Sequence, residues 1–549
     1  MRDLPIRPDS HKNRRMTDPR EIPVIDLFAG PGGLSEGFAS YTGILSLSPT
    51  LSVEKDFHAH QTLELRTFYR QFPLGQAPKE YYEYIRARRV TRDALFSKYA
   101  DEANAARLIA WHATLGEVPL EQLVERVRGA IGDAKHWVLI GGPPCQAYST
   151  IGRARMTRNQ NFSQDHRHTL YREYLKIVAA LNPTIFVMEN VKGILSSKLG
   201  NEKIFGRILN DLRAPFDSLD DLSRKQISRY GNEHQYGVYS FVKQVPWDEA
   251  LEPNDYIIEA ERFGVPQRRH RVILLGIRRD YDQGEHPTLE SSPQEITVDE
   301  IIGSLPAIRS RLSSGDTDTA QWVSAIRRSG PLKGLSTKRF RPVKDCAKDA
   351  VAAMTDSVAE GAPFIRGAFH PRKLDAWLYD KRLRGVVQHD SRFHMADDLC
   401  RYLFAAAYAT VTGDSPRLEN FPRNLWPLHT NAVEDENGRV ANFRDRFKVQ
   451  VSDQPCNTVT AHLSKDGHYF IHPDPVQARS FTPREAARLQ TFPDNYFFEG
   501  PRSKQFHQIG NAVPPYLAWQ LADVVAEILE NCLEQDRLDE PPEYEELVI

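Results

Sequence analysis

Residues 137–146 read Trp-Val-Leu-Ile-Gly-Gly-Pro-Pro-Cys-Gln, and the rest of the chain is organised around them. The apolar run Trp137–Ile140 is short and sharply bounded, which is typical of a buried strand. Two glycines and two prolines end that strand abruptly, so Cys145 is predicted on a rigid loop at its carboxyl end. In an open α/β sheet, ligands bind at that edge. Most cysteines are small buried hydrophobes, so the neighbours of Cys145 decide whether it is a functional thiol.

The composition is that of a globular protein in a reducing compartment. Its 549 residues are 40% apolar and 26% charged, which is ordinary for two or three domains. Five scattered cysteines without a CxxC pair argue against both a disulfide framework and a metal site. The sequence has no apolar run of membrane-spanning length and no signal-peptide core, so it predicts a soluble, cytoplasmic protein. The net charge of −2 means that an anionic partner must be met by local basic clusters.

A second candidate ligand site lies near the N-terminus. Pro23–Phe28 reads as a strand that runs into the glycine turn Gly30–Gly33 and a helix near Leu34–Ala39. This layout lets a ligand approach backbone amides at a helix N-terminus, although a glycine turn alone is as often only a tight turn. The next apolar run ends in Glu54, 24 residues after Gly30. An acid at that distance reaches ribose hydroxyls in dinucleotide-type folds, which favours a nucleoside-binding interpretation.

Strands alternate with helices from residue 21 to about 290, which predicts an α/β fold with a mainly parallel, doubly wound sheet. Thr184–Met188 is the next buried strand after the one before Cys145, and Glu189 follows it directly. Two further predicted strands flank Gln267–Arg271. Cys145 and Glu189 thus follow two strands that are expected to be neighbours, which indicates one site at this edge of the sheet.

Two segments interrupt this pattern. The charged, helical residues 56–110 look like an insertion, for which a solvated helical face is the favoured interpretation. The polar stretch Gly152–His168 after Cys145 is predicted to be either a mobile lid or a plain surface loop.

Residues 291–477 have a different character, with short mixed elements, scattered prolines and basic clusters. Arg327–Lys344 contains seven Lys or Arg and no acid, which suits a phosphate backbone, although a solvated basic face remains open. His389, Arg392 and His394 fit base or phosphate contacts and surface positions equally well. The remaining boundaries are a flexible leader at 1–20, a segment at 478–530 that returns to the first domain, and an acidic tail at 531–549.

The returning segment contains two predicted helices. Thr482 caps the first, with Pro483 at its first position and Glu485 completing a capping box. The second is predicted at Tyr516–Leu529, after the motif Gln508–Asn511.

Taken together, these motifs resemble the cytosine-C5 DNA methyltransferases, and they stand in that family's order. The matching stretches are Asp26–Gly33, Gly142–Gln146, Glu189–Val191, Gln267–Arg271, Thr482–Gln490 and Gln508–Asn511. The resemblance covers nearly the whole chain outside the termini and the 56–110 insertion. It implies a Rossmann-like, S-adenosylmethionine-dependent methyltransferase large domain, with residues 291–477 as a smaller target-recognition domain.

The resemblance also implies catalytic roles. Carbon 5 of cytosine is a poor nucleophile, and a Cys145 thiolate adding to carbon 6 would activate it. Glu189 would hold the ring N3 and amine and supply a proton, while Arg271 holds O2 and Arg269 supports the site. The base cannot be reached inside a duplex, so it would be flipped out under the 152–168 loop.

The implied cofactor is S-adenosylmethionine. Glu54 would bind the ribose hydroxyls and Glu117 the adenine amine, where the family usually has Asp. Lys55 stands where the family often has a bulky residue that stacks on adenine. The remaining expected contacts are Phe28, Ala29, Gly30, Gly32, Gly33, Pro144, Leu170 and Asn511.

Simpler interpretations exist for each residue. Cys145 could be structural, Glu189 a salt-bridge partner, Arg269 and Arg271 a solvated strand face, and Asn511 a helix cap. Three rival functions are an RNA cytosine-C5 methyltransferase, a non-enzymatic DNA-binding regulator and an amino-nitrogen methyltransferase. The long basic segment argues against the first, the intact Cys145, Glu189 and Arg271 against the second, and Gly142–Cys145 against the third.

The prediction is therefore a site-specific DNA cytosine-C5 methyltransferase that acts on double-stranded DNA as a monomer. The resemblance implies that it belongs to a restriction–modification or phage-defence system. Its partners would be a cognate restriction endonuclease or defence proteins, and its location would be nucleoid-associated. The sequence does not give the target site, because base-reading side chains depend on how residues 291–477 sit in the groove.

Overall fold

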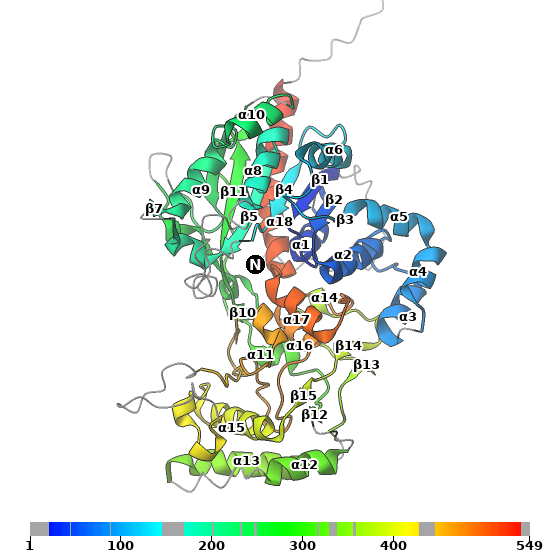
Figure 1. Cartoon of the computed structure of the whole chain (residues 1–549), viewed down its shortest axis with the longest axis vertical. Coiled ribbons are helices and arrows are strands. Elements are labelled where there is room, and N and C mark those ends of the chain that lie inside the picture. Colours follow the sequence, from blue (N-terminus) through cyan, green and yellow to red (C-terminus); the bar gives the residue numbers. More distant parts are fainter. Residues whose placement is uncertain are drawn as a thin grey trace, which may run out of the picture.

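The computed structural model describes residues 21–43, 45–87, 89–144, 170–199, 202–230, 233–245, 250–313, 315, 318–328, 338–354, 358–427 and 445–539. The predicted leader, Cys145, the 152–168 loop, residues 329–337 of the basic run and the end of the acidic tail lie outside these residues. A central sheet with helices on both faces forms the upper part of Figure 1, and a smaller region of helices and short strands lies below it. Within the described part of the chain, no helix combines the length and apolarity that a membrane span requires.

The central sheet has the predicted doubly wound, mostly parallel topology. Among the described residues its strand order is β3-β2-β1-β4-β5-β11-β8, with β9 also paired to β11. The first five of these strands are parallel, and β11 runs antiparallel to β5, β8 and β9. The strands are β1 (Glu21–Leu27), β2 (Ser46–Glu54), β3 (Ala110–His112), β4 (Val138–Gly141), β5 (Ile185–Val191), β8 (Tyr236–Ser240), β9 (Ile257–Glu259) and β11 (His270–Arg278).

The order reverses between β1 and β4, which are neighbours in the sheet although β2 and β3 intervene in sequence. A crevice forms outside the carboxyl ends of the strands at such a switch point. The loops after β1 and β4 therefore meet at one edge of the sheet.

Helices cover both faces of the sheet. One apolar cluster packs α1 (Gly33–Ala39) and the C-terminal helix α18 (Pro515–Asp539) on one face. A second cluster packs α6 (Leu120–Ile131), α8 (Leu170–Leu181) and α9 (Ile204–Arg213) on the other, with α10 (Asp221–Ile227) beside them. A Cβ at Gly37 would come within 2.4 Å of the Ala518 Cβ, so α1 and α18 pack with their backbones almost in contact.

The insertion is helical and has the predicted exposed face, but most of its aromatic residues are buried on the other side. It comprises α2 (Phe57–Arg70), α3 (Lys79–Ala87), α4 (Arg92–Lys98) and α5 (Ala100–Ile109). Tyr81 and Tyr82 are each 1% exposed and pack in a cluster with Leu383, Val387 and Phe497. The favoured interpretation was wrong for these two tyrosines, because they face distant segments that the local pattern does not reveal.

The lower region contains α12 (Thr319–Arg328), α13 (Arg341–Ala353) and the buried α15 (Ala396–Thr412), which share one apolar cluster. Helices α16 (Pro483–Leu489) and α17 (Arg502–Asn511) lie between this region and the sheet (Figure 1). The remaining α-helices and strands of the described residues are β6 (Lys198–Leu199), β7 (Glu202–Lys203), β10 (Gln267–Arg268), α11 (Val298–Ile302), β12 (Arg311–Leu312), β13 (Ala362–Arg366), α14 (Asp375–Leu378), β14 (Gly385–His389), β15 (Phe393–His394) and β16 (Cys456–Asn457).

The capping box at the start of α16 is confirmed: Thr482 accepts a hydrogen bond from the Glu485 amide, and Glu485 accepts one from the Thr482 amide. Helix α18 continues past its predicted end at Leu529 to Asp539, so the first part of the predicted acidic tail is helical.

Candidate active site

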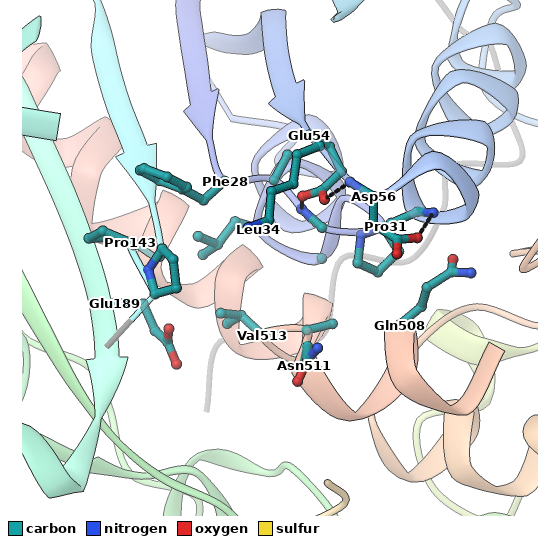
Figure 2. Close-up of a pocket in the computed structure, with 18 of the residues that line it drawn as sticks. Phe28, Pro31, Leu34, Glu54, Asp56, Pro143, Glu189, Gln508, Asn511 and Val513 are labelled. Atoms are coloured by element: carbon teal, nitrogen blue, oxygen red, sulfur yellow. Dashed lines mark hydrogen bonds between the residues drawn. The ribbon is translucent and has the colours of Figure 1, made fainter. Parts of the chain in front are cut away.

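A cavity of about 470 Å³ opens at the carboxyl edge of the sheet, at the switch point between β1 and β4. Figure 2 shows Glu54 on one side of it and Glu189 on another, with Val513 and Asn511 below. Most of the predicted site residues line this cavity: Phe28, Ala29, Gly30, Gly33, Glu54, Pro144, Leu170, Glu189, Arg269, Arg271 and Asn511.

The turn after β1 follows a left-handed path that its sequence permits. Gly30 and Gly32 have φ of 59° and 95°, and Phe28, which is not a glycine, has φ of 62°. A bulky residue in that region is strained, so the surrounding contacts must hold Phe28 in place. The Ala29 amide donates to the Val53 carbonyl at 3.0 Å, which ties the turn to β2. Gly32 is buried behind this turn and does not line the cavity.

Glu54 is fixed at the carboxyl end of β2. One carboxylate oxygen accepts from the Gly30 amide at 2.8 Å and the other from the Asp56 amide at 2.6 Å. Burial raises the pKa of Glu54, and these backbone hydrogen bonds oppose that shift. A carboxylate has about four acceptor positions, so the two amides orient Glu54 and leave it able to accept further hydrogen bonds.

Glu117 is not brought to the cavity. Its side chain is exposed, and its amide and that of Val118 close a turn onto the Thr114 carbonyl. Ala113, Thr114 and Leu115 of the same segment line the cavity instead. Sequence reasoning missed them, although they directly follow β3 and so obey the same strand-end rule as Glu54.

Glu189 and Arg271 form an ion pair, with Arg271 Nε 2.9 Å from Glu189 Oε1. In the antiparallel pairing of β5 and β11, Glu189 lies opposite Ile273 and Val191 opposite Arg271. The two charged residues are therefore diagonal neighbours on one face of the sheet. Burial lowers the pKa of Arg271, and the Glu189 carboxylate opposes that shift.

The loop after β4 packs directly on this ion pair. A Cβ at Gly142 would lie 3.0 Å from Glu189 Oε2, so a larger residue there would crowd the carboxylate. The Asn190 side-chain amide donates to the Pro143 carbonyl at 3.2 Å. Cys145 lies outside the described residues, and its neighbour Pro144 lines the cavity.

Arg269 is 2% exposed and holds separate segments together. Its guanidinium donates to the Val459 carbonyl at 3.0 Å and to the Gly510 carbonyl at 3.3 Å. Burial lowers its pKa well below the ordinary value, and the charge of Arg271 adds to that shift.

His389, Arg392 and His394, for which the sequence favoured neither base contacts nor surface positions, all make hydrogen bonds within the protein. His389 is buried, with its ring nitrogens 3.0 Å from Thr482 Oγ1 and 2.9 Å from the Pro306 carbonyl. His394 is buried against Ser480. Arg392 donates to the carbonyls of Leu463 and Lys465.

The doubly wound sheet is that of a Rossmann-like α/β fold, and the cavity lies at its switch point beside the oriented acid at the end of β2. The chain matches the family model of the C-5 cytosine-specific DNA methylases over residues 100–215 and 252–527. It is 30% identical over 526 residues to the type II methyltransferase M.Bpa9945I of Bacillus paralicheniformis, covering 92% of this chain and 99% of that protein. It is also 25% identical over 412 residues to the DNA (cytosine-5-)-methyltransferase M.ApeKI of Aeropyrum pernix, covering 72% of this chain and 81% of that protein.

Among solved structures, a prophage-encoded DNA modification methyltransferase of E. coli aligns with 93% of this chain and 99% of its own, at 18% identity and a TM-score of 0.44. The chain belongs to the C-5 cytosine-specific DNA methylase family. It is a DNA cytosine-C5 methyltransferase of the restriction–modification type, as its motifs predicted, and methyltransferases of this family in general use S-adenosylmethionine.

Proposed function

We propose that this enzyme methylates carbon 5 of a cytosine flipped out of double-stranded DNA, through a covalent bond between Cys145 and carbon 6. The observation that carries the proposal is the Glu189–Arg271 ion pair, which lies in the same cavity as Glu54 and the glycine turn. The loop that leads to Cys145 packs on Glu189. A base-binding half and a cofactor-binding half thus share one cavity.

The cavity fits S-adenosylmethionine. Its volume of about 470 Å³ lies in the range of small-molecule sites. The oriented Glu54 carboxylate has acceptor positions for ribose hydroxyls, and Phe28 and Leu170 offer apolar surface to the adenine. Ala113–Leu115 take the place beside the adenine that the sequence assigned to Glu117. Ala29, Gly30, Gly33, Pro144 and Asn511 complete the proposed cofactor contacts, and Gly32 supports the turn.

The bound cofactor supplies an electrophilic methyl group on a sulfonium. The Cys145 thiolate adds to carbon 6, and the electron pair of the carbon 5–carbon 6 double bond becomes available at carbon 5. Glu189 holds N3 and the exocyclic amine and supplies a proton at N3 as negative charge develops on the ring. After carbon 5 takes the methyl group, N3 returns its proton to Glu189. Loss of the carbon 5 proton to solvent then expels the Cys145 thiolate and restores the carbon 5–carbon 6 double bond.

Arg271 holds the cytosine O2 in this proposal, and Arg269 fixes the segments around it. The two arginines also give the site a positive potential, which favours the thiolate form of Cys145. The 152–168 loop closes over the flipped base as a lid. Residues 291–477 read the target site, and the biological setting is a restriction–modification or phage-defence system with a cognate nuclease or other defence protein.

Bisulfite sequencing of plasmid DNA from cells that express the wild type or Cys145→Ala tests the function. We expect cytosines within one short motif to resist conversion only with the wild type, which also identifies the target site. If neither culture shows protected cytosines, the DNA activity is contradicted and the RNA substrate becomes the leading alternative.

A further inference from the structure

One wall of the cavity is built by residues 509–516, here called the connector, which comprise the last turn of α17, residues 512–514 and the start of α18. Four of its residues line the cavity: Gly510, Asn511, Ala512 and Val513. The connector abuts the glycine turn, because a Cβ at Gly33 would lie 2.3 Å from the Val513 carbonyl oxygen. A small displacement of the connector would therefore change the shape of the cavity beside the turn.

Two fully buried glutamines hold this connector. Gln490, at the C-terminal end of α16, donates from its side-chain amide to the Ile509 carbonyl at 2.7 Å and the Ala512 carbonyl at 3.0 Å. Gln267 in β10 donates to Gln490 Oε1 at 2.6 Å. Gln267 Oε1 in turn accepts from the backbone amide of Val459 at 2.7 Å. Both side chains are 0% exposed, so water cannot replace a missing partner.

The direction of these hydrogen bonds is fixed by the backbone at each end. The Val459 amide can only donate, so the side-chain oxygen of Gln267 must face it, and the Gln267 amino group must face Gln490. The side-chain oxygen of Gln490 therefore faces Gln267, which leaves its two N–H groups for the Ile509 and Ala512 carbonyls. Every polar atom of the Gln490 side chain is committed.

The residue after Gln490 acts on the other end of the connector. Thr491 has φ of 62°, which is unusual for a β-branched residue. In this conformation its side-chain oxygen accepts from the Tyr516 amide at 3.1 Å. Gln490 and Thr491, the two residues that follow α16, thus hold both ends of the connector.

We propose that Gln267 and Gln490 are positioning residues for the cofactor, which act by holding the connector against the glycine turn. The hydrogen bonds from Val459 through Gln267 and Gln490 to the connector form a relay. It begins where the 291–477 region leads back towards the sheet and ends at the cavity wall. This inference rests on the proposed function, because it takes the ligand of the cavity to be S-adenosylmethionine or its product.

Isothermal titration of S-adenosylhomocysteine into the purified full-length enzyme tests it, with Gln490→Met as the main variant. Methionine has a similar length and removes the donor to the Ile509 and Ala512 carbonyls and one of the two acceptors of the Gln267 amino group, which keeps the Leu489 carbonyl. We expect the Kd to rise by about tenfold or more, since buried polar groups that lose partners are costly.

Gln450→Met is the matched control. Gln450 is also 0% exposed, donates to the Tyr469 carbonyl at 2.7 Å and accepts from Asn457 at 2.8 and 3.0 Å. None of these partners lines the cavity, so this variant should lose comparable thermal stability and keep the wild-type Kd to within about twofold. If both variants weaken binding by the same factor, the relay has no positioning role.

Gln490→Glu gives a second readout that a purely structural role would not move, and it serves if Gln490→Met does not fold. Burial raises the pKa of the introduced carboxyl, so at low pH it is protonated and can donate to one carbonyl. At high pH it is a carboxylate facing two carbonyl oxygens. We expect the Kd of this variant alone to rise between about pH 6 and about pH 8.5. A Kd as independent of pH as that of the wild type would overturn the inference, whereas failure of the wild type to bind S-adenosylhomocysteine would overturn the proposed cofactor site and this inference with it.

Discussion

The edge of the central sheet and the surroundings of α16 use charged residues in opposite ways. At the sheet edge, Glu189 and Arg271 are partly exposed and face a cavity. Around α16, Arg479 and Arg488 are fully buried and paired with Glu485 and Asp494 at 2.6 and 2.7 Å. Buried pairs add little net stability, yet breaking one is costly. The comparison indicates that the first pair is available for chemistry and that the second fixes geometry.

The largest effect on stability is expected when a buried ion pair is broken. Glu485→Gln leaves the Arg479 guanidinium without a counter-charge in a site that is 0% exposed. We expect it to lower the free energy of unfolding by about 3–5 kcal/mol, measured by urea denaturation. Glu121→Gln, which removes an exposed partner of Arg229, should leave the unfolding curve unchanged. An equal small change in both variants would contradict a special role for the buried pair.

The next prediction concerns a residue whose replacement should lower kcat without lowering stability. Glu189→Gln should lower kcat by about 10²-fold or more, because a proton donor at N3 is lost, while the unfolding midpoint changes little. Glu117→Gln is the control, since Glu117 is exposed and outside the cavity, and it should keep the wild-type kcat. The measurement is single-turnover methylation of the motif found by bisulfite sequencing. A larger loss for Glu117→Gln than for Glu189→Gln would reverse the site assignment.

The smaller effects are pH dependences of opposite sign in the two regions. Burial lowers the pKa of His389, beside Glu485, Arg479 and Arg488, from about 6.5 to about 4. A histidine with a depressed pKa contributes stability above its unfolded value that is lost as the pH falls from 6.5 towards 4. His389→Gln cannot take up that proton, so urea denaturation should show a shallower loss of stability over this range than in the wild type.

Asp26, under the glycine turn, titrates in the other direction. Burial raises its pKa from 3.8 to about 7, opposed by a hydrogen bond from Ser35. A carboxyl with a raised pKa contributes stability that is present below 3.8 and lost as the pH rises through about 7. Asp26→Asn should therefore gain stability relative to the wild type above pH 7 and match it near pH 4. A gain for Asp26→Asn that is as large near pH 4 as above pH 7, or a loss of stability for His389→Gln between pH 6.5 and 4 as steep as that of the wild type, would contradict the difference between the regions.

The sheet edge could be predicted from the sequence because its geometry follows from local patterns. Short apolar runs mark the strands, and the ends of parallel strands meet, which brings Glu54, Glu189 and the Gly142–Pro144 loop together. The α16 capping box was equally predictable, since Thr482 and Glu485 lie within one turn.

The rest depends on contacts between residues far apart in the chain. Tyr81 and Tyr82 of the insertion are buried by Leu383 and Phe497, which no local periodicity indicates. The burial of His389 and the relay from Val459 to the connector likewise join distant segments. Glu117 does not line the cavity, because the chain turns at residues 114–118 after β3, a strand that the sequence pattern does not mark.

The central claim is that Cys145 attacks a cytosine in this cavity, and trapping the adduct tests it most directly. A long duplex in which every cytosine is 5-fluorocytosine contains any target site, and fluorine at carbon 5 prevents the proton loss that releases the thiol. With S-adenosylmethionine present, the account predicts a protein–DNA complex that survives denaturing electrophoresis for the wild type and none for Cys145→Ala. The absence of a complex with the wild type, or an equal amount with Cys145→Ala, would contradict it.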